Sequence, residues 1–376
     1  MISRFRIDTT DFKVSLDQRS NLCGLTIRSF PRNYSVAFYK QISDFYTPNF
    51  LAKRPIIIDS NVQAKFRRQL GETDSPVLEI EPIESGKTVE KALEIVEFLD
   101  TCGVNKGAGA VAVGGGLIQD LAGFACGLFK RGVPWCYIPT TLLGQADSCV
   151  GGKTGLNFNG KKNLICSFSA PASVVICHEF IPLLRQEDIR CGLGEMLRLS
   201  ITGGYEAFER FEDFLYSGNP ITINHIADSL VIKKAVVELD EYELNERRAM
   251  NLGHTIAHAI EAATRNRVPH GVAVAFGIGA EALMASDLLN LPQADIGRII
   301  ECVRRIISPG DLENIKAADP EFFFEALLTD KKMVGKSLNF ALLQRIGDIQ
   351  FFPIEINGQF ENISKIVSDL VGELEG

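Results

Sequence analysis

The sequence lacks the features that mark secreted, membrane-spanning and disordered proteins. Its nine cysteines are scattered without a C-x-x-C pair, which favours buried free thiols in a reducing compartment over a disulfide framework. The amino terminus has no apolar h-region, and Gly and polar residues interrupt the apolar stretches. With 46% hydrophobic and 23% charged residues, the composition is that of a globular enzyme. We therefore expect a cytoplasmic protein.

An excess of positive charge is also missing, because 39 Lys and Arg face 47 Asp and Glu, for a net charge of −8. This balance excludes a broad electrostatic footprint for nucleic acid, but it allows local basic pockets for small anions. A chain of 376 residues is too long for one small core and favours two domains.

The two halves of the chain differ in their periodicity. The first half alternates short β-branched runs with helical segments at 91–99 and 122–128, and the strands are expected at 55–59, 110–113, 135–138 and 174–177. The second half is mostly of helical period, with a β-like piece at 338–343, and its helices are expected at 186–202, 221–242, 253–264, 272–290, 294–306 and 320–332. These patterns predict an α/β nucleotide-binding domain with a mostly parallel sheet over 1–180. An all-α domain over 181–376 follows it, with the active site in the cleft between them.

Histidine is scarce, yet three of the five histidines lie between positions 254 and 270. His254 and His258 are four apart on a predicted helix and so share one face, while His270 follows a proline-marked turn. Glu195 lies in a mostly apolar segment, where a carboxylate is costly to bury unless it is paired or bound to a metal. Each residue alone is better interpreted as an ordinary core or surface residue. Together they indicate a Glu/His/His zinc site with one open position.

A glycine-rich turn, Gly114-Gly115-Gly116, joins a predicted strand to a predicted helix that carries Asp120. Such a turn lets the backbone and the helix N-terminus approach a pyrophosphate, although the alternative is a tight turn that needs positive φ. Two further fragments, Asp59-Ser60-Asn61 and Glu84-x-x-Lys87, could contact a cofactor, but each alone is more typical of an N-cap or a surface ion pair.

The densest polar block runs from Pro139 to Asn163 and is rich in Gly, Lys, Thr and Asn. Lysine amines among glycines suit a phosphate or another oxyanion, and the alternative is a solvated surface loop. Further along, Arg247, Asn251 and His254 would share one face of a helix over 240–261 if Gly253 leaves it unbroken, and Lys233 precedes them. Arginine suits a bidentate carboxylate, so this face indicates recognition of a carboxylate and hydroxyls.

These segments together resemble the 3-dehydroquinate synthase family and, more widely, the sugar-phosphate cyclases. The segments that carry the resemblance are GGGLIQDLAGFACGLFKRGV, IPTTLLGQADSCVGGKTGLNFNGKKN, GLGEMLRLS, DEYELNERRAMNLGHTIAHAIE and VPHGVAVAFG. The resemblance implies a lyase that closes a seven-carbon sugar-acid phosphate into a carbocycle. NAD oxidises a ring hydroxyl, phosphate is eliminated, the NADH reduces the ketone, and an aldol step closes the ring. The metal is Zn²⁺ or Co²⁺ in a Lewis-acid role, NAD is not consumed, and the pathway implied is aromatic amino acid biosynthesis.

The resemblance also assigns residues. Glu195, His254 and His270 match the metal ligands, and His258 moves to the phosphate with Lys153, Lys162, Asn163 and one of Lys331 and Lys332. The positions that match nucleotide contacts are Asp59, Asn61, Glu84, Lys87, Gly115, Gly116, Asp120, Thr140, Thr141 and Asp147, with Lys153, Lys162, Phe180 and Leu183 beside the cofactor. Lys233, Arg247 and Asn251 match groups that recognise the substrate's carboxylate and hydroxyls. Arg131 matches an arginine donated across a homodimer interface.

Three positions depart from the family pattern. Arg198 replaces a site lysine, Val272 replaces a carboxylate beside a metal histidine, and Cys177-His178-Glu179 replaces a D-T-D segment. Arginine and lysine are not equivalent, so three alternatives stay open. The first is a paralogous sugar-phosphate cyclase whose product is of the amino-dehydroquinate, inosose or valiolone type. The second is a metal-dependent polyol dehydrogenase, and the third is a non-catalytic binding paralogue.

Overall fold

The computed structural model describes residues 1–16, 24–71, 73–330, 332–356 and 358–375. Their contacts group the chain into two compact units, which we describe separately. The nucleotide unit comprises Gln18–Arg185 and Ile221–Ile226, and the helical unit comprises Met1–Asp17, Gln186–Pro220 and Ala227–Gly376. The sequence prediction put residues 1–180 in the α/β domain. Residues 1–16 instead group with the C-terminal half, because their first strand pairs with a strand near the C-terminus.

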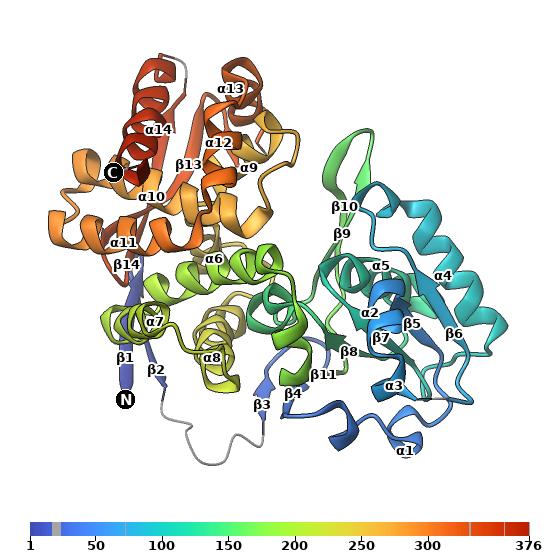
Figure 1. Cartoon of the computed structure of the whole chain (residues 1–376). Helices are drawn as coiled ribbons and strands as arrows, with labels where there is room; N and C mark the ends of the chain where they lie inside the picture. Colours follow the sequence, from blue (N-terminus) through green and yellow to red (C-terminus); the bar gives the residue numbers. More distant parts are fainter. Residues whose placement is uncertain (17–23, 72, 331, 357, 376) are drawn as a thin grey trace. The chain divides into compact units, whose positions relative to one another are not determined.

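The nucleotide unit is built on a seven-stranded sheet in the order β3-β4-β11-β8-β7-β5-β6 (Figure 1). Every neighbouring pair except β3–β4 is parallel. Three central strands are buried along their whole length, as expected for runs covered on both faces. The predicted strands are present, and the full set is β3 (Leu25–Ile27), β4 (Tyr34–Tyr39), β5 (Ile56–Asp59), β6 (Val77–Ile80), β7 (Ala110–Gly114), β8 (Trp135–Pro139) and β11 (Ser173–Cys177).

Helix α5 (Gly116–Leu128) packs on β7 and β8, and α4 (Val89–Thr101) packs on α5. Thr88 caps α4 by accepting a hydrogen bond from the backbone N–H of Lys91 at 3.3 Å. The remaining short helical elements are η1 (Ile42–Asp44), α1 (Pro48–Leu51), α2 (Ser60–Lys65), α3 (Arg67–Leu70), η2 (Glu84–Gly86), η3 (Phe129–Arg131), η4 (Gly144–Ser148) and η5 (His178–Leu183).

The polar block of the sequence forms a β-hairpin in addition to loops. Strands β9 (Lys153–Phe158) and β10 (Lys161–Phe168) pair antiparallel as a separate two-stranded ribbon (Figure 1). Most of β10 is exposed. Its lysines therefore lie on an extended scaffold that the composition of the block did not reveal.

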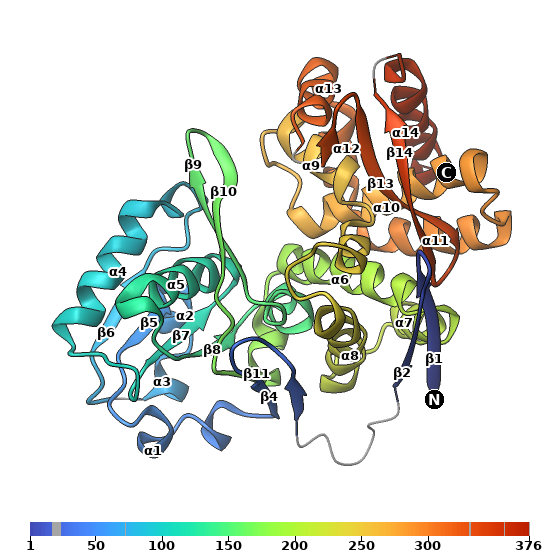
Figure 2. The same ribbon diagram turned by 180° about the vertical axis from the view of Figure 1, so that it is seen from behind.

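The helical unit confirms the predicted change to a helical region, but it is not all-α, because a five-stranded sheet in the order β12-β13-β14-β1-β2 accompanies its helices (Figure 2). The sequence indicated one of these strands. The strands are β1 (Ile2–Ile7), β2 (Thr10–Ser15), β12 (Met333–Val334), β13 (Ser337–Arg345) and β14 (Asp348–Glu355). The helices are α6 (Gln186–Thr202), α7 (Tyr205–Ser217), α8 (Ile223–Leu239), η6 (Glu246–Asn251), α9 (His254–Ala263), α10 (His270–Leu289), α11 (Gln293–Ile306), α12 (Pro309–Lys316), α13 (Pro320–Leu328) and α14 (Phe360–Glu375).

Helix α10 is the centre of the helical unit. It packs against α6, α9, α11, α14 and β13. It is long and apolar enough to span a membrane by length and composition, but 72% of that stretch is buried inside the protein. An all-round apolar helix of this kind is the core helix of its unit.

Glycines let α10 approach its neighbours backbone to backbone. A Cβ at Gly271 would lie 1.8 Å from the carbonyl oxygen of Cys191, and a Cβ at Gly194 would lie 1.8 Å from the carbonyl oxygen of Gly271. A Cβ at Gly277 would lie 2.0 Å from the carbonyl oxygen of Gly253. No other residue type fits at these contacts without separating the helices.

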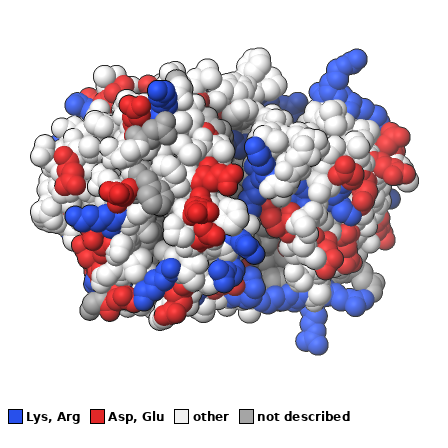
Figure 3. Space-filling model, turned by 90° about the horizontal axis from the view of Figure 1, so that it is seen from above, with Lys and Arg blue, Asp and Glu red and all other residues white. Residues whose placement is uncertain are grey.

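Acidic and basic side chains are interspersed on the face that Figure 3 draws. Salt screens exposed charges from one another beyond about a Debye length. Charges of both signs occur on the part of each unit that this view shows.

Replacing Gly271 by Ala should destabilise the helical unit by about 3 kcal/mol or more, because the new methyl group overpacks the α6–α10 contact. The matched control is Gly297→Ala in α11, where an added Cβ meets nothing within 4 Å. That change should be neutral or stabilising by about 0.5–1 kcal/mol. Urea unfolding monitored by circular dichroism measures both, and equal stabilities of the two variants would contradict the close-contact interpretation.

Candidate active site

Three side chains of the helical unit converge on one point. Glu195 comes from α6, and His254 and His270 are the first residues of α9 and α10. One ligand atom from each lies within 4.8 Å of the other two. Oε1 of Glu195 is 3.4 Å from Nε2 of His254 and 3.2 Å from Nε2 of His270. Two imidazole nitrogens and one carboxylate oxygen are the donor set of a catalytic zinc site with an open position.

Backbone geometry explains how the three ligands meet. Gly194 and Gly271, at the close α6–α10 contact, are the immediate neighbours of Glu195 and His270. On the third element, Gly253 has φ of 79° and caps α9, so His254 begins the helix. The backbone N–H of Gly253 donates to Oε2 of Glu281 at 2.6 Å, which ties this turn to α10.

A shared helix face for Arg247, Asn251 and His254 required an unbroken helix over 240–261, and the structure does not meet this condition. Helix α8 ends at Leu239, the 3₁₀ helix η6 covers Glu246–Asn251, and the left-handed Gly253 precedes α9. Glycine takes positive φ at little cost, which is why the break falls there. Arg247 and Asn251 therefore do not share a helix face with His254.

Arg198 pairs with the carboxylate of Glu195. Its Nε donates to Oε2 of Glu195 at 2.6 Å, and both side chains are about fully buried, at 2% and 3% exposure. Its NH1 lies 3.1 Å from Sδ of Met250. Burial alone would raise the pKa of Glu195, but Arg198 and His254 outweigh it and hold that pKa well below its usual value. The carboxylate is thus ionised, with Oε1 turned toward the histidines.

The two histidines have opposite electrostatic environments. Burial lowers the pKa of His254 to about 4, which leaves the neutral imidazole that binds metals. Burial also disfavours the charged form of His270, but Glu261 and Glu195 outweigh it and raise the pKa of His270. Nδ1 of His270 lies 3.1 Å from Oε2 of Glu261. A carboxylate on the far nitrogen of a metal histidine orients the ring, and Glu261 supplies it where Val272 does not.

His258 lies next to these residues but is not a member of the three-ligand group found in the described part of the chain. Its Nδ1 is 3.4 Å from Oδ2 of Asp330, and Nζ of Lys332 is 3.2 Å from the same oxygen. The structure thus brings His258 and Lys332 to one carboxylate. Lys331, the other predicted phosphate lysine, lies outside the described residues.

The residues predicted to recognise a carboxylate are buried in the helical unit. Arg247 is 2% and Lys233 is 6% exposed. The backbone N–H of Arg247 donates to Oδ2 of Asp240 at 3.0 Å, and its NH1 donates to the carbonyl oxygen of Glu241. Nδ2 of Asn251 donates to Oε1 of Glu243 at 2.9 Å. Local acceptors therefore hold the arginine and the asparagine in defined positions.

The glycine-rich turn of the nucleotide unit ends β7 at Gly114 and begins α5 at Gly116. None of its three glycines has positive φ, so the tight-turn alternative does not explain them. Gly115 caps α5 without a side-chain hydrogen bond, and a Cβ at Gly116 would meet nothing within 4 Å. The first turn of α5 thus has backbone N–H groups without a side-chain cap, as an anion site requires.

Several of the other predicted nucleotide contacts bond to one another. Nζ of Lys87 lies 2.6 Å from Oδ2 of Asp120, and the backbone N–H of Gly155 donates to Oδ1 of Asp120 at 3.1 Å. Asp59 caps α2 by accepting hydrogen bonds from the backbone N–H groups of Asn61 and Val62. It is therefore the N-cap residue of this helix, as the alternative for this fragment predicted.

The rest of the predicted set differs in exposure and bonding. Thr140 donates its N–H to the carbonyl oxygen of Gly114 at 3.0 Å, and Thr141 accepts from the N–H of Gly144 at 3.1 Å. Nδ2 of Asn157 donates to Oε1 of Glu84 at 2.8 Å. The buried members are Thr140, Asp147 and Phe180, and the exposed ones are Asn61, Arg131, Lys153, Lys162, Asn163 and Leu183. The expected cleft location of the site stays a prediction.

Sequence reasoning missed three carboxylates of the helical unit, namely Glu261, Glu281 and Asp330. Glu261 and Asp330 each contact a site histidine, and Glu281 binds the turn before His254. Glu261 was readable as the residue that follows His254 and His258 at helical spacing. Asp330 comes directly before the two predicted phosphate lysines.

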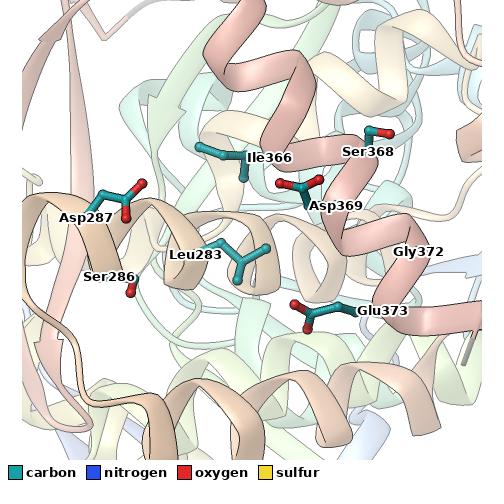
Figure 4. Close-up of a pocket in the computed structure, with 8 residues that line it drawn as sticks. All are labelled: Leu283, Ser286, Asp287, Ile366, Ser368, Asp369, Gly372 and Glu373. Atoms are coloured by element: carbon teal, nitrogen blue, oxygen red, sulfur yellow. The ribbon is translucent and has the colours of Figure 1, made fainter.

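A separate hollow of about 620 Å³ lies between α10 and α14 (Figure 4). It is lined by Leu283, Ser286, Asp287, Ile366, Ser368, Asp369, Gly372 and Glu373. It contains none of the predicted site residues and no histidine, lysine or arginine. Its chemistry does not match phosphate or carboxylate binding.

Comparisons with known proteins identify the family to which the sequence is similar. Residues 77–191 match the family described as 3-dehydroquinate synthase N-terminal, and residues 192–333 match 3-dehydroquinate synthase C-terminal. The 3-dehydroquinate synthase of Caldanaerobacter subterraneus subsp. tengcongensis is 32% identical over 342 residues, which cover 87% of this chain and 95% of that protein. That of Ruminiclostridium cellulolyticum is 34% identical over 295 residues, 77% of this chain and 80% of that protein.

Solved structures are similar in fold. A 2-deoxy-scyllo-inosose synthase complexed with carbaglucose-6-phosphate, NAD⁺ and Co²⁺ has a TM-score of 0.78 at 24% identity, covering 93% of this chain and 99% of that chain. The 2-epi-5-epi-valiolone synthase of Streptomyces hygroscopicus subsp. jinggangensis, with NAD⁺ and Zn²⁺ bound, has a TM-score of 0.75 at 24% identity, covering 91% and 98%. A probable glycerol dehydrogenase of Sinorhizobium meliloti has a TM-score of 0.60 at 13% identity, covering 89% and 96%.

Replacing Glu281 by Gln should make stability less dependent on pH. Burial raises the pKa of Glu281 from 4.5 to about 8, so the folded chain holds one more proton than the unfolded chain between these values. The unfolding free energy should therefore fall as pH rises, by up to about 1.4 kcal/mol per pH unit in this window. The glutamine oxygen can still accept from Gly253 but does not titrate.

The measurement is urea unfolding of both proteins at equal metal content, at about pH 5 and about pH 8.5. The variant should gain stability over the wild type at the higher pH. Parallel pH profiles of the two proteins would contradict a buried, proton-binding Glu281.

Proposed function

The chain belongs to the 3-dehydroquinate synthase family, and we propose that it is an NAD- and divalent-metal-dependent cyclase. Its substrate would be a seven-carbon sugar-acid phosphate, which it converts to a carbocycle with loss of phosphate, as a 3-dehydroquinate synthase does. The observation that carries the proposal is the convergence of Glu195, His254 and His270 within 4.8 Å. This convergence would provide a metal site on the helical unit, and the glycine-rich turn of the other unit would bind the nucleotide.

The site residues fit both cofactors. When bound, Zn²⁺ or Co²⁺ would supply Lewis acidity toward the substrate hydroxyls and NAD would supply a reversible hydride acceptor. Glu195, His254 and His270 would hold the metal. Gly115, Gly116 and the first turn of α5 would bind the pyrophosphate of NAD through backbone N–H groups. The other proposed cofactor contacts are Asp59, Asn61, Glu84, Lys87, Asp120, Thr140, Thr141, Asp147, Lys153, Lys162, Phe180 and Leu183.

The charged residues fit a substrate with two anionic ends. Arg247 and Lys233 would bind the carboxylate, and Asn251 would bind a hydroxyl, since burial strengthens such charge-assisted hydrogen bonds. His258, Lys332, Lys153, Lys162 and Asn163 would bind the phosphate. Arg131, exposed and at the end of η3, would act in the site of a second copy of the chain, so the working enzyme would be a homodimer. Its location would be the cytoplasm.

Arg198 supports one alternative, a paralogous cyclase with another sugar-phosphate substrate. In place of the family's lysine, this buried guanidinium engages Glu195 through Nε. An arginine is bulkier than a lysine and stays charged, so it changes the volume and charge next to the metal ligand. The enzyme would then convert another sugar phosphate to a product of the amino-dehydroquinate, inosose or valiolone type.

The direct test incubates the purified protein with Zn²⁺, NAD and the seven-carbon keto-acid phosphate and measures released phosphate. Phosphate should appear in many turnovers without net NADH. Stoichiometric NADH without phosphate would instead identify a polyol dehydrogenase. No phosphate from this substrate but turnover of another sugar phosphate would identify a paralogous cyclase, and no turnover at all, with no bound metal, would identify a binding paralogue.

His254→Ala should lose bound metal, while His258→Ala should keep it and lose turnover. The reason is that His254 contributes Nε2 to the three-ligand group and His258 bonds to Asp330. Metal content after gentle purification, measured by atomic emission, distinguishes the two. Equal metal loss in both variants would mean that the two histidines four residues apart form the metal pair.

Arg247→Ala should cost on the order of 2–5 kcal/mol in kcat/KM, because it removes a buried charged partner of the substrate's carboxylate. Arg248, its exposed neighbour in η6, is the matched control, and Arg248→Ala should leave kcat/KM unchanged. A substrate analogue without the carboxylate should lose little from Arg247→Ala. An equal loss on both substrates would assign Arg247 a purely structural role.

A further inference from the structure

Each of the three clustered histidines has Nδ1 next to an oxygen acceptor. The acceptor for His254 is the carbonyl oxygen of Leu252 at 3.2 Å, and for His270 it is Oε2 of Glu261 at 3.1 Å. For His258 it is Oδ2 of Asp330 at 3.4 Å. For His258, the acceptor next to Nδ1 favours the proton there and leaves Nε2 for another partner. In His254 and His270, Nε2 faces Oε1 of Glu195, and a bound metal would displace any proton from that nitrogen.

Asp330 is built into the fold as an acceptor. Its side chain is 5% exposed. Its Oδ1 accepts the backbone N–H of Lys332 at 2.8 Å, and its Oδ2 faces both His258 and the ammonium of Lys332. Burial alone would raise the pKa of Asp330, but the hydrogen bond with His258 and the positive charge of Lys332 hold that pKa well below its usual value. An ionised carboxylate has only acceptor atoms.

The packing of α13 explains why Asp330 reaches His258. Helix α13 packs along α9, with Phe323 and Leu327 buried. The chain enters α13 through Asp319, whose N–H donates to the carbonyl oxygen of Ala263 at 3.4 Å. The segment that leaves α13 is thereby placed beside the middle of α9, where His258 lies.

We propose that Asp330 is a positioning residue that holds His258 with the proton on Nδ1, so that Nε2 faces the substrate's phosphate. The same carboxylate holds Lys332 beside that ring. The ring of His258 lies 5.7 Å from that of His254 and 6.2 Å from that of His270, centre to centre. His258 is thus close to the metal ligands without joining them. The phosphate part of this proposal rests on the proposed function, but the control of the ring does not.

The test is long-range ¹H–¹⁵N NMR of the histidine rings, which distinguishes protonated from bare ring nitrogens. Five histidines give a sparse spectrum, and loss of one set in His258→Ala assigns His258. In the wild type, Nδ1 of His258 should carry a proton. In Asp330→Asn the amide oxygen should stay on the N–H of Lys332 and turn the NH₂ toward His258, so the proton should move to Nε2.

Asp330→Ala, which removes the acceptor, should give a mixture of the two tautomers. The matched control is Asp319→Asn, the N-cap of the same helix, which contacts no histidine and should leave the His258 signals unchanged. A bare Nδ1 in the wild type, or the same tautomer in Asp330→Asn and Asp330→Ala as in the wild type, would overturn the proposal.

Turnover provides an independent readout. Phosphate release by Asp330→Asn should fall at least about tenfold, because a wrong tautomer presents the wrong atom to the substrate, and Asp319→Asn should keep the wild-type rate. A wild-type rate in Asp330→Asn would overturn the positioning role. If the wild type itself released no phosphate while Nδ1 of His258 stayed protonated, the proposed function would fail and the control of the ring by Asp330 would stand.

Discussion

The backbone contact between α6 and α10 is the constraint on which the site depends. Gly194 and Gly271 have no side chains, and a Cβ on either would lie 1.8 Å from a backbone oxygen. Glu195 and His270 come directly after and before these glycines in the sequence, so the approach of the two helices sets the 3.2 Å distance between their ligand atoms. Gly253 and Gly277 make a similar backbone-to-backbone contact where α10 meets the start of α9.

Charge compensation then stabilises the buried carboxylate that the packing of the helices places in the site. A buried carboxylate is costly unless it is compensated, and here Arg198 and two histidines surround Glu195. The guanidinium occupies Oε2 and leaves Oε1 toward the histidines. An oxygen acceptor lies next to Nδ1 of each ring, and Nε2 of His254 and His270 faces Glu195. We propose that Nε2 binds the metal in His254 and His270 and the phosphate in His258.

Periodicity predicted the central strands of the nucleotide unit and most helices of the helical unit, because the strands are short apolar runs and the helices carry apolar residues at a helical period. It did not predict that β1 pairs with β14, since pairing between the two ends of a chain leaves no local signal. The hairpin β9–β10 was not predicted either, because its polar composition lacks the apolar pattern of a strand. At the site, the residues themselves could be named, but the break at Gly253 and the partners Glu261 and Asp330 depend on tertiary contacts. The family pattern, and not helical spacing, separated His258 from the metal ligands.

The central claim is that Glu195, His254 and His270 form a metal site with a position left open. X-ray absorption at the zinc edge of the loaded wild-type protein tests it most directly. We expect two imidazole nitrogens, one carboxylate oxygen and one further oxygen from solvent, at about 2.0–2.2 Å. Three imidazoles, or a sulfur at about 2.3 Å from a cysteine such as Cys191, would contradict it.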